Sequence, residues 1–143
     1  MTAGAHPRAA LEFFNGTWTI RGHEGGFREV CRWLPGGGFV ACHSEDPTDA
    51  PPSFAMSVFG YVEADGVYTY SGFSGTGNQR TLRGTLRDGV WRFFGQSERG
   101  PAWRRWQVTI TPTPDGFRLR EEVSERGGDW KEAVTLDYLR VAD

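Results

Sequence analysis

The chain has 143 residues, which is enough for one domain with its own hydrophobic core. A formal net charge of -2 gives no general attraction to nucleic acid. No apolar run approaches the roughly 18 residues of a membrane-spanning helix, and residues 1–10 lack the hydrophobic segment of a signal peptide. We therefore expect a cytoplasmic protein with no nucleic-acid or membrane partner.

The pattern of the chain predicts one short helix, Pro7–Phe14, followed by about ten strands. The expected strands are Thr17–Glu24, Phe27–Leu34, Phe39–Ser44, Ser53–Tyr61, Val67–Phe73, Arg80–Leu86, Val90–Gln96, Trp103–Thr111, Phe117–Val123 and Trp130–Val141. Asp-Gly pairs between several of them supply the positive φ angles of tight hairpins. We expect one all-β domain over residues 1–143, a closed up-and-down antiparallel β-barrel with a short N-terminal helix.

Gly16-Thr17-Trp18 marks the start of the first expected strand. The glycine allows the entering chain to pass close to the barrel floor. The large indole of Trp18 is suited to fill the tapered end of a barrel. We expect Trp18 to be a buried plug.

Hairpin geometry predicts which side chains face the interior. A two-residue turn at Asp88-Gly89 places Leu86 opposite Trp91, with apolar side chains on one face of the hairpin. The turn at residues 35–38 places Cys31 opposite Cys42, with Glu29 on the same inward face. A disulfide and reduced core thiols both fit this pairing, and a cytoplasmic setting favours the thiols. Cysteine and histidine spacing predicts no metal site.

The last hairpin contains the candidate catalytic residues. A loop over residues 125–128 places Glu121 opposite Glu132 on the inward face, and Glu122 opposite Lys131 outside. Two neighbouring buried carboxylates repel, which raises a pKa and suits general acid–base chemistry or a basic ligand. The alternative is that both glutamates lie solvated at the open rim.

The hairpin of residues 53–73 has aromatic or apolar residues on both faces. Phe59, Tyr61, Tyr68 and Tyr70 share one face, and a barrel interior takes up only one face of a strand pair. We expect the aromatic face to be exposed and to form a homodimer interface.

Three segments resemble the bacterial DUF1579 family of the calycin superfamily. They are Leu11–Trp18, then Arg32-Trp33-Leu34 before Phe39, then Phe59-Gly60-Tyr61 before Tyr68 and Tyr70. The resemblance covers nearly the whole chain and implies a lipocalin-like barrel around an apolar cavity, without an established activity. It also implies that Arg140 stacks on the indole of Trp18. Nitrobindins share the Gly-Thr-Trp opening and bind haem through a late histidine, but no histidine follows His43 here. We therefore expect no cofactor.

The first functional hypothesis is the binding of a small apolar or amphipathic ligand inside the barrel. The residues expected to line such a site are Trp18, Glu29, Trp33, Phe93, Trp106 and Tyr138. A second hypothesis is an isomerase or cyclase that uses a cavity glutamate. A third is a structural or interaction protein whose barrel is filled by its own rings. The presence of a cavity distinguishes the first two from the third.

Overall fold

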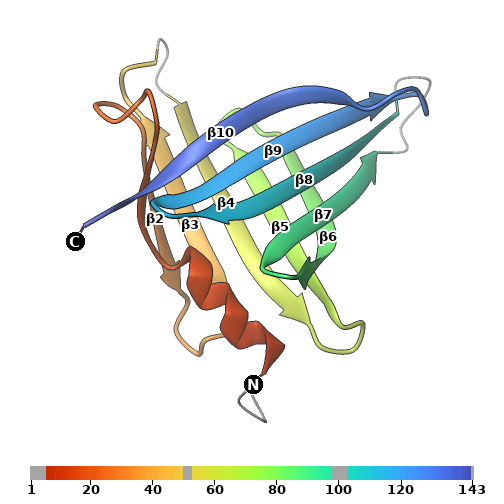
Figure 1. The fold of residues 1–143 in the computed structure, drawn as a ribbon, viewed down its shortest axis with the longest axis horizontal. Helices are drawn as coiled ribbons and strands as arrows, with labels where there is room; N and C mark the ends of the chain where they lie inside the picture. The colour runs from red at the N-terminus through yellow and green to blue at the C-terminus, as the bar shows by residue number, and fades with distance from the viewer. Residues whose placement is uncertain (1–5, 50–52, 98–102, 143) are drawn as a thin grey trace.

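A computed structural model describes residues 6–49, 53–97 and 103–142. Within these residues the chain forms a closed barrel of antiparallel strands, each paired with its neighbours in sequence (Figure 1). The elements are η1 (Pro7–Phe14), β1 (Gly16–Ile20), β2 (Arg28–Trp33), β3 (Val40–Asp46), β4 (Ser53–Val62), β5 (Val67–Ser74), β6 (Gln79–Arg87), β7 (Val90–Ser97), β8 (Arg104–Thr113), β9 (Gly116–Glu125) and β10 (Lys131–Val141). Because β1 pairs with both β2 and β10, the sheet has no free edge. The barrel predicted from the sequence is confirmed.

The hairpin turns have the geometry that their sequences predict. Asp88 and Gly89 both have positive φ, at 53° and 77°, as a tight two-residue turn requires. The turn sets the register of β6 and β7, in which Leu86 lies opposite Trp91. Gly84 lies opposite Phe93, at a point where any side chain would collide with the backbone of β7. The predicted register of this hairpin is therefore confirmed.

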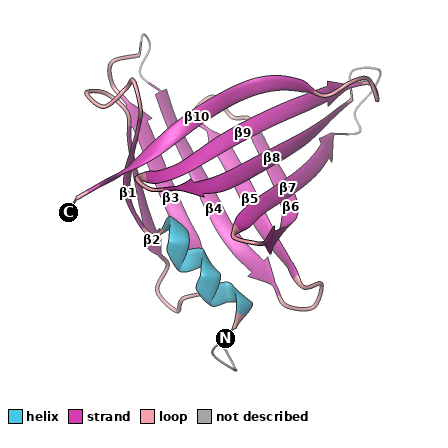
Figure 2. Ribbon diagram, in the orientation of Figure 1, coloured by secondary structure: helices cyan, strands magenta, loops and turns pink. Residues whose placement is uncertain are grey.

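The helix η1, a 3-10 helix, lies across one end of the barrel (Figure 2). Its buried Phe14 stacks on Phe59, with ring centroids 3.9 Å apart, and its backbone carbonyl accepts a hydrogen bond from the indole of Trp18. Arg140 covers the other side of the indole, with its guanidinium 4.2 Å from the ring centroid. The same guanidinium donates to the carbonyl of Asn15, so that it joins the helix to the last strand. This end of the barrel is closed, and the structure places Arg140 where the resemblance implied.

The last hairpin has a different register from the predicted one. Glu132 lies opposite Glu122, and after an irregularity in the pairing Val134 lies opposite Glu121. The predicted pairs of Glu121 with Glu132 and of Glu122 with Lys131 are therefore wrong. The reason is twofold: the connection runs over residues 126–130, one residue longer than the expected loop, and a bulge between Glu132 and Val134 shifts the pairing by a further residue.

The prediction of an exposed aromatic face on β4–β5 is also wrong. Phe59, Tyr68 and Tyr70 point into the barrel, where Phe59 stacks against Tyr70 at 4.7 Å between ring centroids. The outward face is aliphatic at its centre and has the partly exposed Phe73 paired with Met56. The rings turn inward because they fill the wide interior of the barrel. In the described part of the chain, no helix has the length and apolar character needed to span a membrane.

Candidate functional site

The open end of the barrel contains a cavity of about 530 Å³. We call it the mouth cavity. It is lined by Ala55, Met56, Ser57, Gly72, Phe73, Ser74, Asn78, Gln79, Arg80, Arg104 and Trp106. These residues come from β4, β5, β6, β8 and the β5–β6 turn, at the strand ends far from η1. The volume falls in the range that is typical of small-molecule sites.

Two arginines give the mouth cavity its polar wall. Arg80 of β6 pairs with Glu121 of β9, and its guanidinium lies 5.4 Å from the ring centroid of Trp106. Arg104 of β8 lies 3.6 Å from the carboxylate of Glu125. Each arginine thus has an acidic neighbour, which balances the charge and holds the guanidinium in place. Guanidinium groups fixed in this way offer directed hydrogen-bond donors to a ligand.

The rest of the wall is apolar or small. Trp106 supplies apolar surface, and Ser57 supplies a hydroxyl. Met56 and Phe73 border the cavity at its edge, and their side chains belong to the outward face of β4–β5. Gly72 points to open space, because a Cβ built on it meets no atom within 4 Å. A cavity with apolar surface and a few directed polar groups suits an amphipathic small molecule.

Below the mouth cavity the barrel interior is almost full. A void of about 10 Å³ remains there, lined by Phe14, Trp18, Glu29, Cys31, Ser57, Phe59, Tyr70, Ile110, Phe117, Leu119 and Tyr138. A void of this size has room for at most one water molecule. Ser57 lines both spaces, so the void lies directly beneath the mouth cavity. The barrel is therefore hollow at its open end and packed with rings at its closed end.

Glu29 is the acidic residue of this packed region. It lies on β2 beside the void, and it forms no ion pair with any residue in the described ranges. Burial raises the pKa of its carboxyl group to about 7, because a low-dielectric surrounding disfavours the charged form. Burial, followed by the nearby Glu29 charge, also raises the pKa of Tyr70 to about 12. At neutral pH the carboxyl group of Glu29 is thus near half protonation.

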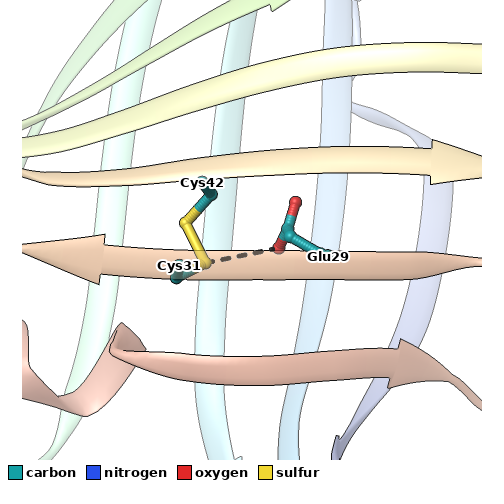
Figure 3. Close-up of side chains that lie close together, drawn as sticks. All are labelled: Glu29, Cys31 and Cys42. Atoms are coloured by element: carbon teal, nitrogen blue, oxygen red, sulfur yellow. Dashed lines mark hydrogen bonds between the residues drawn. A yellow bond between two sulfur atoms is a disulfide. The ribbon is translucent and has the colours of Figure 1, made fainter.

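Cys31 and Cys42 form a disulfide between β2 and β3, next to Glu29 (Figure 3). The expectation of reduced thiols is therefore wrong. The predicted pairing of the two cysteines across the strands is confirmed, as is the placement of Glu29 on their face. Directly opposed cysteines on adjacent strands are close enough to bond. The expectation failed because it was based on an assumed compartment rather than on this geometry.

The residues predicted to line one ligand site are divided among different places. Trp106 lines the mouth cavity, whereas Trp18, Glu29 and Tyr138 border the small void. Phe93 is wholly buried in the core, and the indole of Trp33 donates to Glu12 of η1.

The two glutamates proposed as catalytic residues are also separated. Glu121 faces the interior and binds Arg80 beside the mouth cavity. Glu132 is exposed and lies 3.2 Å from Arg120 on the outer side of the sheet. The structure therefore does not bring the two carboxylates together.

Sequence reasoning missed Arg80, the central polar residue of the mouth cavity. Arg80 shares the inward face of the buried Leu82, because alternate residues of a strand share one face. Strand alternation is therefore the signal that could have identified Arg80. An arginine at an inward position near a strand end is a strong indication of a polar cavity wall.

Comparison of the chain with protein-family models and with curated proteins found no match.

Proposed function

We propose that this protein binds a small amphipathic molecule in the mouth cavity. The observation that carries the proposal is the cavity itself, which has about 530 Å³ between an apolar wall and the guanidinium of Arg80. The apolar part of a ligand would lie against the ring of Trp106. Its polar group would accept hydrogen bonds from Arg80 and Ser57.

Binding is better supported than catalysis. An isomerase or cyclase needs a carboxyl group in contact with its substrate. Glu29 borders a void with room for one water, Glu121 is bound to Arg80, and Glu132 lies outside the barrel. A barrel filled throughout is not supported either, because the open end is hollow.

We also propose membership of the calycin superfamily, of the DUF1579 type. The closed barrel, the Gly16–Trp18 opening and the stacked Arg140 support this assignment. A cytoplasmic location remains part of the proposal, although the Cys31–Cys42 disulfide is more typical of an oxidising compartment.

The proposal is tested with the amphipathic fluorophore 1-anilinonaphthalene-8-sulfonate. We expect saturable binding of one molecule per chain, with a blue-shifted emission. Gly72→Leu fills the cavity without a clash and should weaken binding at least tenfold. Gly38→Leu is the matched control, since Gly38 also faces open space but lies in the β2–β3 turn, and it should bind as the wild type does.

Two results would contradict the proposal. One is the absence of any saturable fluorescence change with the wild-type protein. The other is equal affinity in wild type and Gly72→Leu, which would place the fluorophore elsewhere on the surface. Melting curves of both variants confirm that the comparison is made between folded proteins.

A further inference from the structure

Three side chains that are typical metal ligands gather beneath the floor of the mouth cavity. The carboxylate of Glu29 and the sulfurs of Cys31 and Cys42 all lie within 4.8 Å of one another (Figure 3). One carboxylate oxygen of Glu29 is 3.9 Å from the sulfur of Cys31. All three come from the paired strands β2 and β3, which fix their relative positions.

The disulfide blocks these sulfurs as ligands, and reduction would release them. A dithiol reductant supplies two electrons and two protons, the S–S bond breaks, and the reductant becomes a disulfide. The backbone pairing of β2 with β3 holds Cys31 opposite Cys42 independently of the bond. The two thiols therefore stay on the same inward face, next to the carboxyl group of Glu29.

The surroundings leave room for a fourth ligand. Ser57 of β4 lies directly opposite Cys42, and the void beside it has room for about one water. Ser57 also lines the mouth cavity, so this residue borders both the open end and the void. The void is otherwise lined mostly by rings and aliphatic groups, which keep competing water out.

We propose that the reduced chain binds a thiophilic divalent cation, of the Zn²⁺ class, through Cys31, Cys42 and Glu29, with a water in the void as the fourth ligand. Two thiolates, one carboxylate and one water form a tetrahedral set that suits Zn²⁺. Binding replaces the protons of both thiols and any proton on Glu29. It also gives the buried carboxylate of Glu29 a positively charged partner. The site forms only in the reduced state and is independent of ligand binding in the mouth cavity.

The test uses Co²⁺ as a spectroscopic probe for Zn²⁺. Full-length protein is reduced with a phosphine under anaerobic conditions and titrated with Co²⁺. We expect one Co²⁺ per chain, thiolate-to-cobalt charge-transfer absorption, visible bands of tetrahedral Co²⁺, and displacement by Zn²⁺. The oxidised protein should show none of these signals.

Variants assign the ligands. Glu29→Gln should bind Co²⁺ at least tenfold more weakly while it keeps the thiolate absorption. Glu45→Gln is the matched control, because Glu45 is exposed on the neighbouring strand β3, and it should bind as the wild type does. Cys31→Ala/Cys42→Ala should lose the signal while its circular-dichroism spectrum still shows the barrel.

The proposal is overturned if reduced wild type takes up no stoichiometric Co²⁺. It is also overturned if Cys31→Ala/Cys42→Ala binds Co²⁺ equally well, or if Glu29→Gln and Glu45→Gln have the same affinity. A reduced wild type whose circular-dichroism spectrum lacks the barrel would overturn it too, because the site depends on the paired strands.

Discussion

Trp18 connects three parts of the molecule through one side chain. Its indole is 1% exposed, donates a hydrogen bond to the carbonyl of Phe14 and lies under the guanidinium of Arg140. The first strand, the helix and the last strand therefore all depend on it. Stacking of an arginine on an indole contributes about 0.5–2 kcal/mol, and the loss of a buried ring costs more.

We expect Trp18→Ala to lower the free energy of unfolding by about 3–5 kcal/mol, since the mutation leaves a large hole in packed surroundings. Chemical denaturation measures this change. Phe94→Ala is the control, because Phe94 is 51% exposed on β7, and it should change stability by no more than about 0.5 kcal/mol. A Trp18→Ala melting temperature within a degree or two of wild type would refute the assignment of Trp18 as the plug.

Glu29 makes stability depend on pH. Its pKa in the folded protein is about 7, against a value of 4.5 for an unperturbed glutamate. At a pH between these two pKa values, the carboxyl group of Glu29 keeps its proton in the folded protein but has lost it in the unfolded chain. Stability therefore falls as pH rises through this window, and the full loss is present above pH 7.

We expect this loss to disappear in Glu29→Gln, whose side chain does not ionise. In oxidised, metal-free protein, wild type should lose on the order of 2–3 kcal/mol more than the variant between about pH 5 and pH 8. Urea unfolding at the two pH values measures the difference. The exposed variant Glu45→Gln should keep the wild-type dependence, and equal pH slopes in wild type and Glu29→Gln would show that the carboxyl group titrates normally.

At the scale of elements, β2 and β3 are joined twice, by their backbone ladder and by the Cys31–Cys42 disulfide. The two cysteines are 11 residues apart in sequence, so the bond closes a short loop in the unfolded chain. Loops of this order contribute about 3 kcal/mol in the chain-entropy account. The backbone hydrogen bonds between β2 and β3 are formed along the whole pair of strands and do not depend on the disulfide.

Cys31→Ala/Cys42→Ala should therefore lower stability by about 2–3 kcal/mol and leave the barrel intact. Denaturation without added reductant gives the energy, and far-ultraviolet circular dichroism gives the fold. Reduced wild type should be destabilised to a similar extent, which provides an internal control. A chain that loses its strand signal on reduction would show that the bond is needed for folding and not only for stability.

The β9–β10 hairpin shows where sequence reasoning about an element reaches its limit. Strand alternation alone puts Phe117, Leu119 and Leu136 on one face of the hairpin, and in the structure that face is the barrel interior. The register was wrong for two reasons. The connection is one residue longer than predicted, with Arg126 and Gly127 both at positive φ, and a bulge follows between Glu132 and Val134. No Asp-Gly pair marks this turn, so the local sequence does not specify its length.

At the scale of the whole molecule, the outer surface of β4–β5 carries several exposed apolar side chains. Phe54 is 57% exposed there and Phe73 is 37% exposed, with Met56 and Val58 beside them. Apolar surface of this kind is more typical of an interface than of a solvated sheet. We propose that a homodimer forms through this face.

Light scattering at tens of micromolar should therefore give the mass of a dimer. Phe73→Glu should shift it to the monomer, because a charge at the centre of an apolar interface is costly. Phe94→Glu replaces another exposed ring on β7 and should leave the mass unchanged. A monomeric wild type would refute the dimer.

The sequence by itself determined the fold. Alternating apolar residues, Asp-Gly turns and the Gly16–Trp18 opening specify strands, hairpins and a closed end, because each depends on residues close together in the chain. Only the tertiary structure decided the functional geometry. The pairing of Arg80 with Glu121 joins β6 to β9, and the disulfide and the carboxyl group of Glu29 meet Ser57 across three strands. Such contacts depend on how the barrel closes and on how much of its interior the aromatic rings fill. Neither property can be read from residues that are close together in the sequence.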